Sequence, residues 1–282
     1  MLPKADLHIH TACSDGRLTP HEAVDAAYNA NLAAFSITDH DTIQGYFLAE
    51  EYAKKVGIEL IPGVEITASM DDKEVHILAY YFDPKSESLN KLLLAQRVGR
   101  RERIKGIINT LVESGININY EDVRAEANGA NIGRPHVAQV LIKKGYVGNF
   151  FEAFSKYLSN EKLGEIKHTY PSYLAVIEGI KSAGGASILA HPGKLFSTAE
   201  TERFLTAGID GLECIHPSHN YTLQKKYSEL TATNSLLLTG GSDYHGGVER
   251  ANVQLGVVSV AMKYVAKMKR MTDQRKSIVN IT

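Results

Sequence analysis

The segment Asp6-Leu7-His8-Ile9-His10-Thr11 combines an apolar strand with two histidines two residues apart. Alternate residues of a strand point to the same face, so both imidazoles can bind one ion. A lone histidine on an apolar strand is more often a hydrogen-bonded core residue than a ligand. A pair at this spacing is more informative. The segment therefore predicts a first strand that ends at a metal site, around which the rest of the fold is arranged.

Similar motifs recur along the chain, including Asp243-Tyr244-His245, which repeats the spacing of two residues. Imidazole and carboxylate groups are the ligands that Zn, Mn and Fe accept, and no thiol is needed. Such clusters mark metal or catalytic sites, although His76 alone would be weak evidence. We therefore predict a multinuclear metal site that does hydrolytic chemistry. Its candidate ligands are six histidines and three carboxylates, namely His8, His10, Asp15, His40, Glu65, His76, His191, Asp243 and His245.

The composition fits a soluble enzyme of 282 residues with 44% hydrophobic content and a net charge of -1. A near-neutral chain argues against a protein that binds long nucleic acid through a basic surface. Met1-Leu2-Pro3-Lys4 leads directly into the first motif without an apolar signal segment, and no stretch approaches a membrane span. Cys13 and Cys214 are too few for a disulfide framework. We expect a cytoplasmic protein without membrane contact.

Apolar strand-like runs alternate with helical patterns, which predicts parallel strands joined by crossover helices. Thr19-Pro20-His21-Glu22 is a typical helix start between the first two strands. Most candidate ligands lie at or just after the carboxyl ends of the predicted strands. The α/β barrels build their active sites on that face. The predicted strands are Ala5 to His10, Ala33 to Thr38, Glu59 to Thr67, Val75 to Phe82, Ala186 to Ala190, Gly211 to Ile215, Leu236 to Thr239 and Val253 to Val260.

The strand pattern disappears between residues 88 and 167, where the sequence predicts helices. An insertion of this size is usually a lid or specificity element, although it could merely enlarge the core. The chain thus divides into a barrel, residues 1–87 and 168–282, and a helical insertion, residues 88–167. Within the insertion, Gly133-Arg134-Pro135-His136 places two cationic side chains at a helix start, which suits an anion. The basic run of Arg97, Arg100, Arg101, Arg103 and Lys105 is interpreted as a solvated helix face.

These motifs together resemble the PHP (polymerase and histidinol phosphatase) family of metal-dependent phosphoesterases over nearly the whole chain. Gly133-Arg134-Pro135-His136 and the stretch Glu213-Cys214-Ile215-His216-Pro217-Ser218-His219 are similar to the bacterial branch that hydrolyses nucleoside 3′,5′-bisphosphates, some of whose members also trim short RNA from the 5′ end. The resemblance implies an α/β fold, a distorted (β/α)7 barrel with an inserted helical subdomain.

The resemblance also implies three divalent ions. His8, His10, Glu65 and Asp243 would hold the first ion. Glu65 would bridge to a second ion held with His76 and His191. Asp15, His40 and His245 would hold the third. Three ions carry +6 against -3 from the carboxylates, which leaves about +3 to face an anionic substrate. Two filled sites would leave less, and Mn is the expected metal, although Mg, Zn or Fe would also fit N/O ligation.

The expected mechanism needs no covalent nucleophile. A metal-bound water held by Glu65, His191 and Asp243 would attack phosphorus in line. The resemblance implies that Arg134, His136 and His219 would bind the substrate. Asp39 and Asp41 are interpreted as groups that orient His40 and its loop.

The predicted reaction removes the 3′-phosphate of a nucleoside 3′,5′-bisphosphate, with short single-stranded RNA as a further substrate and no obligate protein partner. Histidinol phosphate phosphatase and a polymerase-associated exonuclease subunit remain alternatives, and so does a metal-binding regulator without activity. The basic C-terminal segment from Lys263 to Lys276 is either a final amphipathic helix or a disordered end that helps to hold RNA.

Overall fold

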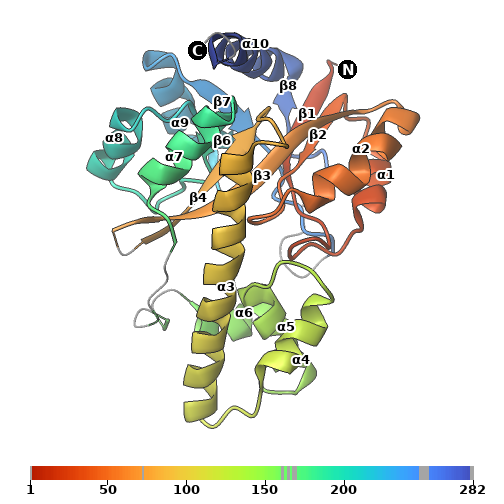
Figure 1. The fold of residues 1–282 in the computed structure, drawn as a ribbon, viewed down its shortest axis with the longest axis vertical. Coiled ribbons are helices and arrows are strands. Elements are labelled where there is room, and N and C mark those ends of the chain that lie inside the picture. The colour runs from red at the N-terminus through yellow and green to blue at the C-terminus, as the bar shows by residue number, and fades with distance from the viewer. Residues whose placement is uncertain are drawn as a thin grey trace.

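The computed structural model describes residues 2–71, 73–159, 162–163, 166, 170–247 and 254–279. Its centre is one mixed sheet that curls into an almost closed barrel, with helices outside it and a helical insertion at one end (Figure 1). The strand order is β7-β6-β5-β4-β3-β2-β1-β8. These strands are β1 (Lys4–Ile9), β2 (Ala34–Ile37), β3 (Glu59–Met70), β4 (Lys73–Tyr80), β5 (Ala186–Leu189), β6 (Gly211–Ile215), β7 (Leu237–Gly240) and β8 (Val260–Ala261).

The first half of the barrel consists of parallel strands joined by helices. Helix α1 (Pro20–Asn29) connects β1 to β2, and α2 (Gln44–Val56) connects β2 to β3. The side chain of Thr19 accepts from the backbone N–H of Glu22, whose side chain accepts from the backbone N–H of Thr19, so the predicted capping box is present. The carboxyl ends of these strands therefore meet at one mouth.

The prediction that all strands run parallel was wrong at β4 and also at β8, which is antiparallel to β1. Strand β4 is antiparallel to both β3 and β5. The stretch from residue 68 to residue 74 separates the two predicted strand runs, and a parallel crossover needs a dozen or more residues. The chain instead turns back tightly at Asp71, whose φ is 54°. The α/β barrel class is nevertheless confirmed, with seven strands, β1 to β7, around the barrel.

The second half of the barrel returns to parallel pairing. The connecting helices are α7 (Tyr173–Ser182), α8 (Thr198–Thr206) and α9 (Tyr221–Thr233). The segment after β7 then meets β1, because the N–H of His10 donates to the carbonyl of Tyr244 at 2.8 Å. A Cβ on Gly241 would lie 2.4 Å from the backbone nitrogen of His8. Only glycine allows the segment after β7 to approach β1 this closely.

The last predicted strand, Val253 to Val260, was largely wrong. Residue 253 lies outside the described residues, residues 255–258 form a turn and a bend, and β8 consists of Val260 and Ala261 alone. Helix α10 (Met262–Val279) follows and covers the end of the barrel opposite the insertion (Figure 1). The basic C-terminal segment is therefore a helix, and it lies away from the mouth.

Helix α3 (Glu87–Glu113) links the barrel to the insertion (Figure 1). At 27 residues it is about 40 Å long, which is enough for its first half to pack on the barrel while its second half extends beyond the mouth. The helices α4 (Tyr120–Ala127), α5 (Arg134–Lys143) and α6 (Phe150–Ala153) and a π-helical turn (Phe154–Leu158) pack against that second half. These elements share their own apolar cluster around Ile107, Val137 and Leu141. Among the described residues, no helix is long and apolar enough to cross a membrane.

Candidate metal centre

The nine predicted ligands all lie at the mouth of the barrel. His8 lies on β1 and His10 directly after it, and both are fully buried. Glu65 lies beside them on β3 with 1% exposure. The other six lie nearer to solvent, with Asp243 the most exposed at 29%. The structure thus brings together side chains from strands that are more than 230 residues apart in sequence.

The donor atoms of the first predicted set have the spacing that one ion requires. His8 Nε2 lies 3.1 Å from His10 Nε2 and 3.3 Å from Glu65 Oε2. His10 Nε2 lies 3.2 Å from Glu65 Oε2 and from Asp243 Oδ1. With bonds of about 2.1 Å, neighbouring ligands lie about 3.0 Å apart in an octahedron and about 3.4 Å apart in a tetrahedron. The observed spacing falls between these values.

The second predicted set shares Glu65. Its Oε1 atom lies 2.9 Å from His76 Nδ1 and 2.9 Å from His191 Nε2, while its Oε2 atom faces the first set. A carboxylate that presents one oxygen to each of two donor groups has the geometry of a bridge between two ions. His191 stands after β5 with a φ of 29°, a left-handed conformation that is uncommon outside glycine.

The third predicted set is looser. Asp15 Oδ1 lies 3.4 Å from His245 Nε2, and Asp15 Oδ2 lies 4.0 Å from His40 Nε2. His10 joins this group, because its Nδ1 atom lies 3.6 Å from Asp15 Oδ1. The Nδ1 atom of His40 also lies 3.2 Å from Glu65 Oε2. His40 therefore lies between the bridging carboxylate and the third set.

The residues at the mouth fit metal ions on two further observations. Among the described residues, the buried Nδ1 atoms of His40 and His76 face Glu65 without making a hydrogen bond. The rings of His10 and His245 stack with centroids 4.2 Å apart. Buried polar atoms without partners are costly, and like groups that can carry the same charge repel one another. Metal coordination would give the Nδ1 atoms a partner and would hold the two imidazoles together in their neutral forms.

The side chains of the cluster also shift one another's pKa values. Burial disfavours the charged form of His10, but the carboxylates of Asp243 and Glu65 raise its pKa to about 9. Burial likewise opposes protonation of His76, and Glu65 raises its pKa to about 10. Burial raises the pKa of Glu65, but His40 and His76 hold it well below its usual value. Ions that bind here must displace protons, so affinity for metal rises with pH.

Glu213 is a member of the site to which the sequence assigned no role. Its Oε1 atom lies 2.9 Å from His8 Nδ1, and its Oε2 atom accepts from the backbone N–H of His191 at 2.8 Å. A carboxylate on the second nitrogen of a ligating histidine fixes the ring and its tautomer. Glu213 therefore orients two candidate ligands at once. Its place two residues after the start of β6, in the motif that ends at His219, was the available signal.

His216 is a second such residue. Its Nδ1 atom accepts from the backbone N–H of Ser218 at 3.1 Å, so the neutral ring carries its proton on Nε2. That buried Nε2 atom has no hydrogen-bond partner among the described residues and lies 3.4 Å from Asp243 Oδ2. His216 thus presents an N–H group to the centre.

Asp39 and Asp41 order loops, and neither makes a hydrogen bond to the His40 ring in the described structure. Asp39 accepts from the backbone N–H and the hydroxyl of Thr11 at 2.7 and 2.6 Å. Asp41 accepts from the backbone N–H of Thr67 at 2.7 Å and pairs with Arg100 at 2.8 Å. Asp39 therefore fixes the loop after β1, and Asp41 joins the mouth to α3.

Two arginines of the basic run lie in the site, so the prediction of a solvated face was wrong for them. Arg100 and Arg103 are only 8% and 7% exposed. Arg103 pairs with Glu74, and Arg134 lies 3.5 Å from the same carboxylate. Glu74 in turn lies 3.2 Å from His76 Nε2. A pocket lined by these side chains opens onto the cluster at Asp15, His40 and His76.

His136 and His219, both predicted to bind substrate, come from the insertion and from the loop after β6, respectively. The Nδ1 atom of His136 accepts from the backbone N–H of Gly133 at 3.0 Å, which fixes the ring at the start of α5. For His219, Nε2 accepts from the N–H of Gly193 and Nδ1 lies 2.9 Å from the carbonyl of Cys214. Both His219 nitrogens are engaged, so substrate contact would require one bond to open.

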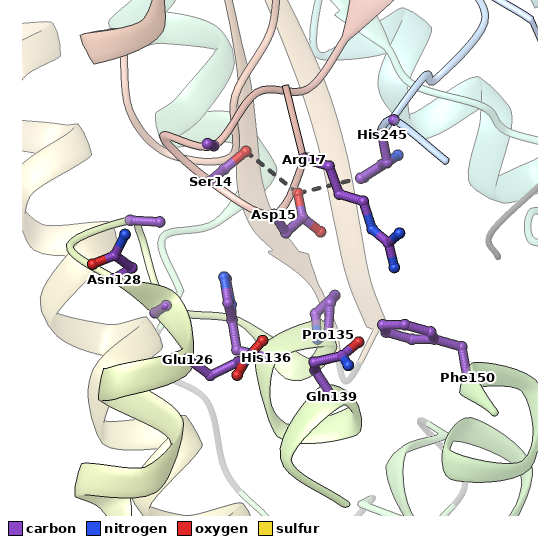
Figure 2. Close-up of a pocket in the computed structure, with 15 residues that line it drawn as sticks. Ser14, Asp15, Arg17, Glu126, Asn128, Pro135, His136, Gln139, Phe150 and His245 are labelled. Carbon is purple, nitrogen blue, oxygen red and sulfur yellow. Dashed lines mark hydrogen bonds and ion pairs between the residues drawn. The ribbon is translucent and has the colours of Figure 1, made fainter. Parts of the chain in front are cut away.

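A second pocket flanks the cluster on the other side of Asp15. Figure 2 shows Asp15 and His245 joined by a dashed line at its upper edge and His136 and Gln139 of α5 at its lower edge. Arg17 and Phe150 complete one side. The pocket therefore lies between the barrel and the insertion, next to the third predicted set.

Comparisons with known proteins agree with this geometry. The model of the PHP domain matches residues 6–176. A 5′-3′ exoribonuclease of Haemophilus influenzae is 35% identical over 250 residues, which cover 87% of this chain and 91% of the relative. A 3′,5′-nucleoside bisphosphate phosphatase of Chromobacterium violaceum is 34% identical over 247 residues, which cover 85% and 86%.

A solved structure from Bifidobacterium adolescentis, described as a metal-dependent phosphoesterase, superposes with a TM-score of 0.87. It is 32% identical, and the match covers 95% of this chain and 96% of that one. The barrel and its crowded mouth thus define a metal-dependent phosphoesterase, which is a hydrolase. The chain belongs to the PHP domain family.

Proposed function

We propose that this protein removes the 3′-phosphate of nucleoside 3′,5′-bisphosphates, with two or three divalent ions, foremost Mn, held by the nine side chains at the mouth. The observation that carries the proposal is a cationic group placed directly beside the cluster. Within the described residues, Arg100, Arg103 and Arg134 face two carboxylates, Asp41 and Glu74, so the ion pairs of this part of the chain join three guanidinium groups to two carboxylates. A substrate with two phosphates at ribose spacing would use both the ions and this group.

The side chains of Arg100, Arg103 and Arg134, the arginine group, are held in fixed positions, which suits the binding of an anion. Arg134 is held by Glu74, by the carbonyl of Leu158 at 3.2 Å and by the ring of Phe154, 5.8 Å from its guanidinium carbon. Arg103 lies over the ring of Tyr170. A preordered guanidinium loses little conformational entropy when it binds phosphate. We therefore assign the retained 5′-phosphate to Arg134 and its neighbours.

The metal ions, when bound, supply positive charge at the scissile phosphate and an activated water for in-line attack at phosphorus. Within the protein, Glu65 faces two donor sets at once and Glu213 orients His8 and the backbone of His191. The Nε2–H group of His216 is suited to donate to an oxygen of the scissile phosphate. Water replaces the 3′-oxygen on phosphorus, so the products are a 5′-mononucleotide and inorganic phosphate.

Short RNA is a second candidate substrate, favoured by the pocket of Figure 2 beyond Asp15 and by the exoribonuclease of H. influenzae among the relatives. In RNA the 3′-phosphate of the first nucleotide is a diester. The same attack would release a 5′-mononucleotide and leave a 5′-phosphate on the shortened chain. The alternative of a histidinol phosphate phosphatase does not call for two anion sites of this kind, because its substrate carries one phosphate.

The test compares kcat/KM for adenosine 3′,5′-bisphosphate, AMP and histidinol phosphate with Mn present and products identified by chromatography. We expect the bisphosphate to be preferred by roughly 10-fold or more, since one phosphate contact is worth about 1.5–3 kcal/mol. The product should be AMP and not adenosine 3′-monophosphate. A faster reaction with histidinol phosphate, or AMP losing phosphate as quickly as the bisphosphate, would overturn the proposal.

A further inference from the structure

A groove lies between α3, α4 and the loops that follow β1 and β2. Its lining includes three arginines, Arg97 and Arg101 from α3 and Arg124 from α4. The only carboxylate among the described lining residues is Glu121, which pairs with Arg124 at 3.2 Å. The groove therefore carries an excess of two positive charges on a chain whose net charge is -1.

Helix α3 presents its arginines on two faces. Arg100 and Arg103 are buried against the mouth, where they pair with Asp41 and Glu74. Arg97 and Arg101 are one turn apart on an exposed face and line the groove. Neither makes an ion pair or a side-chain hydrogen bond within the part of the chain that the structure describes.

The groove is continuous with the active site. It shares Ala12, Ala127, Asn128 and Ala130 with the pocket of Figure 2, and that pocket reaches Asp15 of the third predicted metal set. The pocket of the arginine group touches Asp15 from the other side. A chain entering at Arg134 would therefore pass the metal cluster, the pocket of Figure 2 and then the groove.

The groove also offers surfaces for the parts of a nucleotide that carry no charge. Leu48 and Leu94 line it and are 49% and 52% exposed. The ring of Tyr120 lies in its wall, with the ammonium of Lys105 5.7 Å from the ring centroid. Aromatic and apolar surfaces beside guanidinium groups are what proteins use to bind single-stranded nucleic acid.

We propose that this groove binds the nucleotides of a single-stranded RNA that follow the scissile phosphate. The proposal rests on the proposed function, because it places the first nucleotide at the metal cluster with its 5′-phosphate on the arginine group. The groove then selects for chains longer than a bisphosphate. Arg97 and Arg101 bind backbone phosphates two or more nucleotides beyond the cut and leave the hydrolysis of small nucleotides unchanged.

The experiment measures binding of a 5′-phosphorylated hexaribonucleotide with phosphorothioate linkages, which resists cleavage, to the metal-loaded protein at several salt concentrations. Each phosphate neutralised on a single strand contributes about 0.7 to the slope of log affinity against log salt. Arg97→Ala/Arg101→Ala should therefore lower the slope by about 1.4, which corresponds to roughly 25-fold weaker binding at 0.1 M salt.

The matched control is Lys269→Ala/Arg270→Ala, which removes two exposed cations from α10 at the opposite end of the molecule (Figure 1). It should bind the oligonucleotide as the parent does. Equal binding by the Arg97/Arg101 variant and the parent would overturn the proposal, and so would no binding by the parent. A loss confined to the α10 variant would transfer RNA binding to the C-terminal helix and overturn it as well.

Hydrolysis of adenosine 3′,5′-bisphosphate separates this proposal from the proposed function. Both variants should keep the parent's kcat and KM for the bisphosphate within about twofold, because neither pair touches the first nucleotide. If the parent binds RNA through Arg97 and Arg101 but hydrolyses no nucleotide, the groove stands and the proposed function fails. A loss of bisphosphate activity in the Arg97/Arg101 variant would contradict a role confined to the nucleotides beyond the cut.

Discussion

The barrel mouth and the helical insertion contribute opposite chemistry to one site. The barrel supplies all nine candidate ligands, imidazoles and carboxylates that bind cations. The insertion and the helix that carries it supply guanidinium groups, which bind anions, at Arg100, Arg103 and Arg134. Under the proposed function, the barrel holds the ions and the insertion selects the phosphate ester that reaches them.

The two regions also have separate cores. The insertion packs around its own apolar cluster, which includes Ile107, Val137 and Leu141 and contains no barrel strand residue. The strands and their covering helices form the other clusters. The effects of substitutions at residues in contact are strongly coupled, whereas the effects of substitutions at independent sites add. Substitutions in the mouth should therefore change metal content, and substitutions in the insertion should change substrate binding with metal content intact.

The largest effect is expected at Glu65, whose two oxygens face different donor sets. Glu65→Gln is nearly isosteric but removes the charge that offsets two cations. Metal content should fall and turnover should drop roughly 1,000-fold or more, about 4 kcal/mol of transition-state stabilisation. Glu59→Gln, on the exposed end of the same strand, is the matched control. Unchanged metal stoichiometry with full activity would remove Glu65 from the site.

A smaller effect is expected at Arg134, which belongs to the insertion. Arg134→Ala should weaken substrate binding by roughly 1.5–3 kcal/mol, the range for hydrogen bonds to charged groups, with metal content unchanged. Arg134→Lys should restore only part of the affinity because it lacks the planar fork. Arg203→Ala removes an exposed, ion-paired arginine on α8 and serves as the control. If the Arg134 variant lost metal, the proposed division of roles would be incorrect.

The smallest effect is expected at Glu213, which contacts His8 and the backbone of His191 and is expected to act through them. Glu213→Gln should weaken metal binding about 10- to 100-fold, the usual cost of losing a group that orients a ligand. Metal titration of the metal-free protein measures this directly, and excess Mn should restore activity. Glu229→Gln on the exposed face of α9 should change nothing. Activity that stays low at saturating metal would show that Glu213 does more than orient ligands.

Much of the fold could be predicted from the sequence because the motifs end apolar strands. His8-Ile9-His10 and Asp243-Tyr244-His245 lie at the carboxyl ends of β1 and β7, the first and last of the seven barrel strands, which meet through Ile9 and Tyr244. The helical character of the insertion was also predicted, because the strand pattern disappears between residues 88 and 167, and Asn119 and Asn149 cap two of its helices. The direction of β4 was missed because the strand pattern was considered without the length of the connection.

The remaining features depend on contacts between distant residues. Glu74 and Glu213 are ordinary strand carboxylates in the sequence, and their roles follow from the side chains opposite them. Arg100 and Arg97 belong to one basic run, and only the packing of α3 on the barrel separates the buried arginine from the exposed one. Whether the nine side chains at the mouth are ligands stays a prediction.

The most direct test of the account is a crystal structure of the Mn-loaded protein with AMP, with the ions located by anomalous scattering. We predict Mn within about 2.0–2.3 Å of the donor atoms of Glu65 and of the histidines around it. The 5′-phosphate of AMP should lie on Arg134, with the 3′-hydroxyl facing the ions. Ions bound elsewhere, or the AMP phosphate on the metals with Arg134 away from it, would contradict the division between a barrel that holds metal and an insertion that holds substrate.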